Sequence, residues 1–211
     1  MVGYRILMDE AQGEYEEKKS KFIALVRPIS SEQEALDFIA EVKKKRWDAR
    51  HNCSAFVLGK NNELTRCSDD GEPSGTAGRP MLEVLIGSGI HDVAVVVTRY
   101  FGGVLLGTGG LVRAYTQAVK NALDAAVTGV MREGYRVVMS FPYQDIDTVK
   151  KYTEAEGITT EKEDYLENVV YTCIFPEEIF EDGVKALVDR TGGRIDISEP
   201  EKCSFLDKDN T

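Results

Sequence analysis

The strongest constraint on the fold is a β-branched run, Asp92–Val97 (DVAVVV). A short continuous run of this kind is typical of a central strand that is covered on both faces. It leads through Thr98–Gly103 (TRYFGG) to a segment that begins at Thr108 and has an alanine at every fourth position, Ala114, Ala118 and Ala122. Residues at this spacing share one helix face, and small side chains let that face lie close against a sheet. We therefore expect a buried strand, a glycine-rich loop and a long helix that ends near Thr128 and Gly129.

The remainder of the first 130 residues shows further strand and helix patterns. Lys21–Ile29 is expected to be a strand, and Ser31 with Glu34 forms the capping-box pattern that opens a helix. A hairpin is expected from Cys53–Leu58 and Glu63–Cys67, followed by a helix that starts near Pro80.

A basic run, Lys43–Arg46, ends the first of these helices and is followed by Trp47. Cations at a helix C-terminus complement the helix dipole, so a solvated helix end is the ordinary interpretation. The alternative is a patch that binds nucleic acid or an acidic partner.

The second half predicts a compact α/β pattern. Asp145 is expected to cap a helix that ends at Gly157, and a second helix is expected to stop at Gly192 and Gly193. The expected strands are Tyr135–Phe141, Ile158–Glu163, Asn168–Phe175 and Arg194–Ile197. The resulting order, βαββαβ, is that of a ferredoxin-like domain, and the polar tail from Glu199 is expected to fray. We therefore predict an α+β protein with two domains, residues 1–130 and residues 131–211.

The composition points to a cytoplasmic protein with no membrane partner. The longest apolar run, Val93–Val97, is far shorter than the roughly 20 residues of a membrane span, and the first residues lack a signal-peptide pattern. The four cysteines form no C-x-x-C pair, so we expect reduced thiols.

The net charge of −10 is unevenly distributed. Residues 1–130 contain 16 Lys and Arg against 17 Asp and Glu, a net charge of −1, whereas residues 131–211 contain 10 against 19, a net charge of −9. Because an acidic surface repels phosphates, nucleic-acid binding is expected only in the first domain, on a local basic patch.

A glycine cluster follows the central strand: Gly102, Gly103, Gly107, Gly109 and Gly110. Free backbone N–H groups at the start of a helix favour an anion, and phosphate is the obvious candidate. However, Thr108-Gly109 stands where a P-loop requires Lys-Ser/Thr, and Val112 stands where a dinucleotide-binding loop requires Gly. The missing residues argue against standard NTPase and Rossmann functions, and glycines that serve only turns and close packing are the alternative to an anion site.

Charged residues of both signs flank this loop. Arg79, Arg99 and Arg113 suit phosphate or carboxylate, because a guanidinium donates to such groups in a fork. Asp69, Asp70 and Glu72 lie equally close in sequence, so they either pair with the arginines or hold a hard cation such as Mg²⁺. Because Asp-Gly and Glu-Pro are ordinary turn residues, we assign no metal site.

His51, Cys53 and Cys67 could form a soft-metal set, or a Cys/His nucleophile pair. Alternation along a strand places His51 and Cys53 on one face. A small buried cysteine is the commoner arrangement, so we assign no catalytic residue and no cofactor, and we favour a protein without enzymatic activity.

Several ordered motifs between residues 15 and 125 resemble the IMPACT/YigZ family. They are Ser20–Ala24 (SKFIA), Ala49–Cys53 (ARHNC), Ser68–Pro80 (SDDGEPSGTAGRP), Val97–Gly103 (VTRYFGG) and Gly107–Tyr115 (GTGGLVRAY). The resemblance implies a first domain with a fold shared by a small-subunit ribosomal protein, by domain IV of elongation factor G and by a group of small-molecule kinases. It also implies a second domain similar to domain V of elongation factor G.

The eukaryotic members of that family regulate translation during amino-acid starvation, through contacts of an additional N-terminal domain that these 211 residues do not contain. The resemblance therefore implies a translation-associated regulator that binds RNA, the ribosome or a regulatory protein partner. The partnership of the eukaryotic members is not transferred to this chain. The aromatic residues Tyr100, Phe101 and Tyr115 would suit stacking with RNA bases if exposed, although core packing is expected for Phe101.

The predicted ligand-binding residues all lie in the first domain. They are Arg50, His51, Asp69, Asp70, Glu72, Thr76, Arg79, Arg99, Tyr100, Gly102, Gly103, Gly107, Gly109, Gly110 and Arg113. Two alternatives stay open: an enzyme or sensor for a small phosphorylated ligand with Mg²⁺, and a protein-interaction module that uses the acidic second domain.

Overall fold

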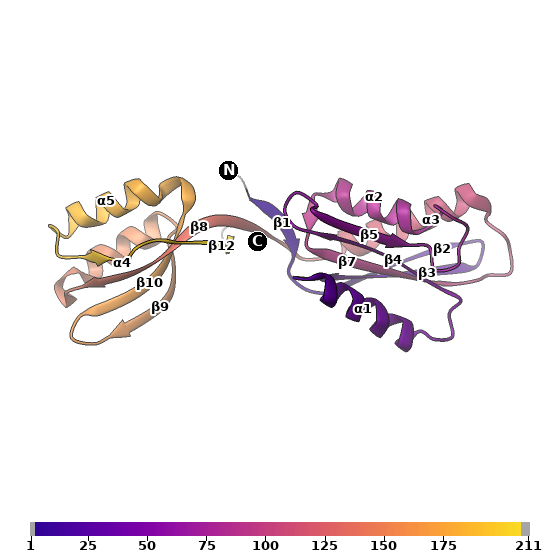
Figure 1. The fold of residues 1–211 in the computed structure, drawn as a ribbon, viewed down its shortest axis with the longest axis horizontal. Coiled ribbons are helices and arrows are strands. Elements are labelled where there is room, and N and C mark those ends of the chain that lie inside the picture. The colour runs from indigo at the N-terminus through magenta and orange to yellow at the C-terminus, as the bar shows by residue number, and fades with distance from the viewer. Residues whose placement is uncertain (1–2, 208–211) are drawn as a thin grey trace. The chain divides into compact units, whose positions relative to one another are not determined.

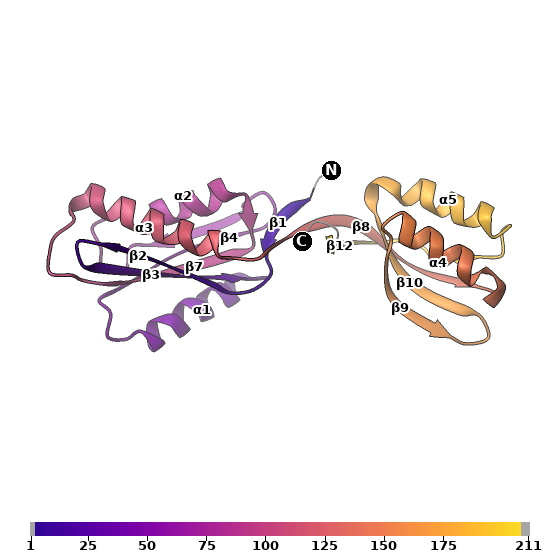
Figure 2. The ribbon, with the colours of Figure 1, turned by 180° about the vertical axis from the view of Figure 1, so that it is seen from behind.

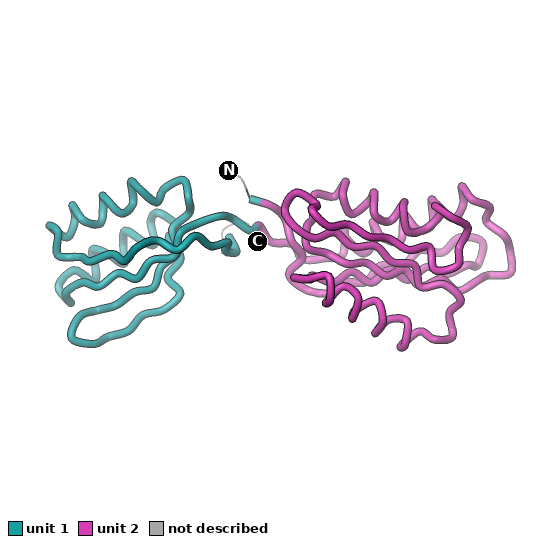
Figure 3. Tube along the Cα trace, in the orientation of Figure 1, with its two compact units in different colours: residues 1–3, 131–207 teal, residues 4–130, 208–211 magenta. Residues whose placement is uncertain are grey.

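The structure, a computed structural model, describes residues 3–207 and divides into two compact units (Figures 1 and 3). The N-terminal unit comprises Tyr4–Val130, and the C-terminal unit comprises Met131–Asp207 with Gly3. The predicted α+β class and the ferredoxin-like order of the second half are confirmed. None of the helices in the described part of the chain is long and apolar enough to span a membrane.

A five-stranded antiparallel sheet in the order β2-β3-β7-β4-β5 forms the centre of the N-terminal unit. Its strands are β2 (Ala11–Glu17), β3 (Ser20–Pro28), β4 (His51–Leu58), β5 (Leu64–Ser68) and β7 (Val93–Tyr100). β7 is the middle strand, as its β-branched run predicted. Its odd-numbered valines pack with one hydrophobic cluster, whereas Ala94 and Val96 pack with another on the opposite face.

Helices cover both faces of this sheet. The helix α1 (Glu32–Lys45) covers one face, and α2 (Gly78–Ser88) and α3 (Gly107–Asp124) cover the other (Figure 1). The alanines of α3 are fully buried against the sheet. The helix ends at Asp124, before the predicted Thr128, because Thr128 already begins the strand β8 (Thr128–Phe141). A short parallel pair, β1 (Tyr4–Leu7) and β6 (Ile90–His91), completes the unit.

The predicted capping box at the start of α1 is present in shifted form. The hydroxyl Oγ of Ser31 accepts from the backbone N–H of Glu34 at 3.2 Å. The Glu34 carboxylate accepts from the N–H and the hydroxyl of Ser30, one residue earlier than in the usual box.

The C-terminal unit packs α4 (Ile146–Ala155) and α5 (Phe180–Arg190) on a sheet that contains β8, β9 (Thr159–Tyr165) and β10 (Val169–Pro176). Two further strands, the short β11 (Asp196–Ile197) and β12 (Glu201–Asp207), also pair with β8. Two 3₁₀ turns, Tyr143–Asp145 and Glu177–Ile179, precede the helices.

Two expectations for this unit were wrong. The expected fraying from Glu199 is wrong for Glu201–Asp207, because β12 pairs with β8 and Phe205 and Asp207 point inward. Residues 208–211 of the predicted tail lie outside the described residues. Asp145 precedes α4, but its side chain does not cap that helix. Its carboxylate instead accepts two hydrogen bonds from the guanidinium of Arg194, at 2.7 and 2.9 Å.

Candidate functional site

The start of β4, the end of β7 and the start of α3 surround a pocket of about 620 Å³, which we call the α3 pocket. His51 lies directly opposite Arg99 in the β4–β7 ladder, so the strand pairing itself brings these predicted residues together. The pocket is lined by Asp48, Ala49, Arg50, His51, Gly71, Glu72, Pro73, Arg99, Tyr100, Phe101, Leu105, Leu106, Gly107, Thr108 and Leu111. It therefore combines cations, apolar side chains and the backbone of a helix start.

A buried polar network lies in the wall of this pocket. Arg99 is only 7% exposed, and its Nη1 donates to Oε1 of Glu72 at 2.7 Å. The hydroxyl of Tyr115 donates to the same oxygen at 2.8 Å. The Arg99 guanidinium also lies 5.5 Å from the ring centroid of Phe22 and 5.6 Å from that of Phe101. One of the predicted pairings between the arginines and the acidic turn is thus present, between Arg99 and Glu72.

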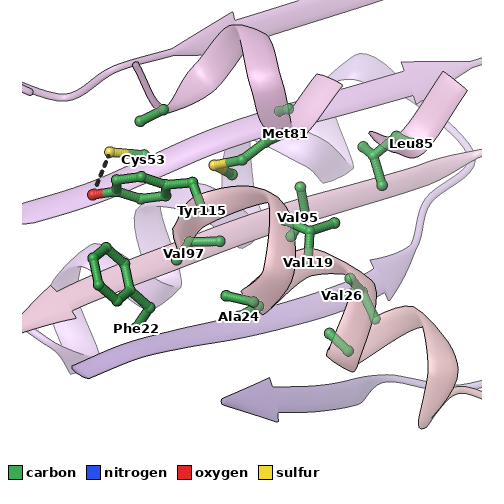
Figure 4. Close-up of a cluster of buried hydrophobic side chains, with 14 of the residues drawn as sticks. Phe22, Ala24, Val26, Cys53, Met81, Leu85, Val95, Val97, Tyr115 and Val119 are labelled. Carbon is green, nitrogen blue, oxygen red and sulfur yellow. Dashed lines mark hydrogen bonds between the residues drawn. The ribbon is translucent and has the colours of Figure 1, made fainter. Parts of the chain in front are cut away.

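The network continues to Cys53, as Figure 4 shows. The sulfur Sγ lies 3.3 Å from the Tyr115 hydroxyl and 3.0 Å from the carbonyl oxygen of Asp69. Burial raises the pKa of the Cys53 thiol to about 12, and burial likewise raises the pKa of Tyr115. Because a thiol that stays protonated is a poor nucleophile, the arrangement gives no support to the Cys/His nucleophile hypothesis. His51 bonds elsewhere, from Nδ1 to the carbonyl of Asp70 at 2.9 Å.

The two aspartates of the acidic turn are engaged with the protein itself. The carboxylate of Asp69 accepts from the backbone N–H groups of Gly75, Ala77 and Gly78, at 2.8 to 3.0 Å, and so caps the start of α2 from a distance. Partial burial works to raise the pKa of Asp69, but these donors outweigh it and hold the pKa below its ordinary value.

The neighbouring Asp70 has similar constraints. Its carboxylate accepts from Nζ of Lys43 at 2.5 Å and from the backbone N–H of Asn52 at 2.7 Å. Burial again opposes the shift, and the bond from Lys43 is the main contribution that lowers the pKa of Asp70. Within residues 3–207 no group of three His, Cys, Asp or Glu side chains is arranged to hold a metal ion. The turn therefore orders the loop before α2 and anchors the end of α1.

Two glycines of the cluster are required by the backbone. A Cβ on Gly102 would lie 2.1 Å from the carbonyl carbon of Lys19, so only glycine lets this loop approach the β2–β3 turn. Gly107 has a φ of +70° and opens α3. No side chain caps this helix start, and no acidic residue lies in its first turn. The N–H groups there are thus free of a competing side-chain carboxylate.

Other predicted site residues do not line the α3 pocket. Arg79 is exposed on α2 and pairs with Glu83 at 2.9 Å, whereas Arg113 is exposed on α3. Thr76 donates its hydroxyl to the carbonyl of Pro73 and stabilises the turn. The remaining residues outside the lining are Asp69, Asp70, Gly102, Gly103, Gly109 and Gly110. The three arginines therefore do not converge on one anion.

The exposure of two aromatic side chains differs from the sequence-based expectation. Phe101 was expected in the core but is 52% exposed, whereas Tyr115 is fully buried and cannot stack with a base. Leu105 lines the pocket and is 83% exposed, and Asp48 accepts a hydrogen bond from the Tyr100 hydroxyl at 3.2 Å. The glycines that follow Phe101 were the available signal, because they predict a loop and loops lie at the protein surface.

Comparisons with known proteins match both units. Residues 18–123 match the family model for the Impact N-terminal domain, and residues 139–194 match that of a domain of unknown function, DUF1949. IMPACT family member YvyE of Bacillus subtilis is 39% identical, over 90% of this chain and 88% of the relative. An IMPACT family member of Haemophilus influenzae is 34% identical, over 93% and 97%.

A solved structure of a protein described as hypothetical superposes with a TM-score of 0.62 at 32% identity, over 95% of this chain and 98% of its own. The sequence motifs of residues 15–125 had indicated the same relationship. The chain therefore belongs to the IMPACT family.

Proposed function

We propose that this protein is a translation-associated, non-enzymatic RNA-binding protein that binds single-stranded RNA, free or in the ribosome. The proposed binding surface is one end of the N-terminal unit, which we call the basic end. It comprises the exposed residues Lys18, Lys19, Lys44, Lys45, Trp47, Arg50 and Phe101. Family membership and the implied link to translation support the role, and the chemistry of the basic end supports the ligand.

The basic end is assembled by the strand pairing. Lys21 lies opposite Tyr100 in the β3–β7 ladder, and Gly102 touches the backbone of Lys19. The turn between β2 and β3, the C-terminus of α1 and the start of α3 lie at the same end of the sheet (Figure 2). The five cations of the basic end form no ion pair with any residue that the structure describes. They are therefore available to phosphates.

The observation that carries the proposal is the backbone of Lys18 and Lys19. Both residues have positive φ, +48° and +66°, in the two-residue turn between β2 and β3. Such a turn is normally built from Asn and Gly, because Gly has no Cβ, Asn tolerates the left-handed region, and longer side chains are strained there. Two consecutive lysines in strained positions lower the stability of the fold, so we infer that their positive charge is retained for binding.

Exposed aromatic rings accompany these charges. Trp47 is 83% exposed and directly precedes Asp48, whose carboxylate accepts a hydrogen bond from the hydroxyl of Tyr100. Phe101 is 52% exposed, and its ring lies 5.6 Å from the Arg99 guanidinium. Proteins that bind single strands combine a basic surface with rings on which bases stack, and each stacked base contributes about 1–3 kcal/mol.

The test is a titration of the full chain with a fluorescent single-stranded RNA, followed by anisotropy over a range of salt concentrations. Phe101→Ala should weaken binding about tenfold or more through lost stacking. Arg50→Ala should weaken it less and make the salt dependence shallower. Arg66→Ala is the matched control, because Arg66 is exposed on β5 and pairs with Glu32 at the start of α1. Absence of RNA binding at low salt would overturn the proposal.

A further inference from the structure

The start of the helix α3 lies in the wall of the α3 pocket. The backbone of Gly107 and Thr108 lines the pocket, and the first N–H groups of a helix have no partner within it. Neither a capping side chain nor a first-turn carboxylate occupies this helix start. The helix dipole adds a partial positive charge at the same place.

A second, independent observation points to a ligand in the same pocket. Arg99 is 93% buried in the pocket wall, and its Nε has no hydrogen-bond partner within the described part of the chain. A buried donor without a partner is costly, and an anion in the pocket beside the Arg99 guanidinium would stabilise its positive charge. The charge of Glu72 does not oppose such a ligand strongly, because Arg99 and Tyr115 both donate to it. The other carboxylate of the lining, Asp48, accepts from Tyr100.

The remainder of the pocket is apolar and of limited size. Phe101, Leu105 and Leu111 lie in the lining beside the start of α3. A volume of about 620 Å³ is in the range that holds one small molecule, and it excludes a stacked duplex. A ligand with one phosphate next to one flat apolar group, small enough for this volume, is a single nucleotide.

We propose that the α3 pocket binds a single nucleoside 5′-phosphate, with its phosphate on the N–H groups of Gly107 and Thr108 and its base against Phe101. The inference rests on the proposed RNA-binding function and names the unit that it recognises. The nucleotide is the 5′-phosphorylated end of a single strand or a free mononucleotide, and the two sources share the same chemistry.

The test is ¹⁵N NMR of the full chain, with adenosine 5′-monophosphate, adenosine, and a short adenosine oligonucleotide with or without a 5′-phosphate. The monophosphate should shift the amide signals of Gly107 and Thr108 and bind about tenfold more tightly than adenosine. Thr108→Glu places a competing carboxylate in the first turn, where it also favours the helix, and should weaken binding about tenfold. Gln117→Glu, which adds the same charge on the exposed face of α3, should leave binding unchanged.

The outcomes separate this proposal from the broader one. Shifts caused by the 5′-phosphorylated oligonucleotide alone would support the pocket and assign it to RNA ends. If neither phosphorylated probe shifts these amides, the pocket proposal is wrong, even when RNA still binds the lysines of the basic end. If the monophosphate binds and RNA does not, the pocket stands and the proposed RNA-binding function fails.

Discussion

Replacing Lys18 and Lys19 by Asn and Gly should increase stability and reduce RNA binding at once. Each lysine is held at positive φ, which costs an L-residue with a Cβ about 1 kcal/mol. Gly removes the strain at position 19 and Asn reduces it at position 18, a gain of up to about 2 kcal/mol, of which the greater freedom of Gly in the unfolded chain offsets up to about 1 kcal/mol. The expected net gain in the free energy of unfolding is about 1 kcal/mol, or a rise in Tm of about 3–6 °C for the N-terminal unit.

The same double substitution removes two charges that face the proposed RNA. The slope of log K against log salt should become shallower by about 1.4, since each contact between a cation and a single-strand phosphate contributes about 0.7. Thermal unfolding and anisotropy titrations from about 50 to 200 mM salt measure the two effects. Arg at both positions is the first control, because it retains both the charge and the strain.

A second control, Lys162→Gln with Lys185→Gln, removes two positive charges from the C-terminal unit and should leave the slope unchanged. A lower unfolding temperature of the Asn-Gly variant would show that the two lysines are not strained. A salt slope that stays at the wild-type value would show that they do not contact the RNA.

Three further predictions concern the buried polar residues. Glu72→Gln leaves the Arg99 guanidinium buried without its carboxylate and should lower the free energy of unfolding by about 3–5 kcal/mol, measured by denaturant titration; a loss below 1 kcal/mol would contradict the network. The pKa of Asp69 is depressed in the folded state, so its stabilising effect is full above the unfolded pKa of about 3.9 and is lost as the pH falls through the folded value. Wild type should therefore exceed Asp69→Ala in stability at pH 7 by about 1–2 kcal/mol, and the difference should shrink below about pH 4, whereas a difference that grew in acid would refute the assignment. With its pKa raised to about 12, Cys53 should resist a thiol reagent at pH 8 while the exposed Cys67 reacts, as mass spectrometry of the native protein would show; fast labelling of Cys53 would mean that its site opens readily.

Features with a strong local cause were predictable from the sequence. The run of valines in β7 can satisfy burial on both faces only as a middle strand, and the alanine stripe of α3 fits one helix face against that sheet. The serine and glutamate at the start of α1 act through local hydrogen bonds, so their role could be predicted at nearly the correct residue.

Features that depend on the direction of a side chain were not predictable in the same way. Arg79, Arg99 and Arg113 lie near one another in sequence, but only Arg99, on a strand end, lines the α3 pocket. The other two lie on exposed helix positions. Asp145 has an ordinary capping position, yet Arg194, which is distant in sequence, binds its carboxylate. A single sequence contains no signal for such partners, because the fold decides which of several compatible charges meet.

The most direct test of the basic end uses the one tryptophan of the chain, Trp47, which is 83% exposed within it. In a titration with unlabelled single-stranded RNA, we expect saturable quenching of Trp47 fluorescence that is reversed by salt, because a base stacks on the ring while phosphates contact the neighbouring lysines. RNA binding that is detected by anisotropy but leaves the emission of Trp47 unchanged would place the RNA elsewhere on the protein and overturn the basic end as the binding surface.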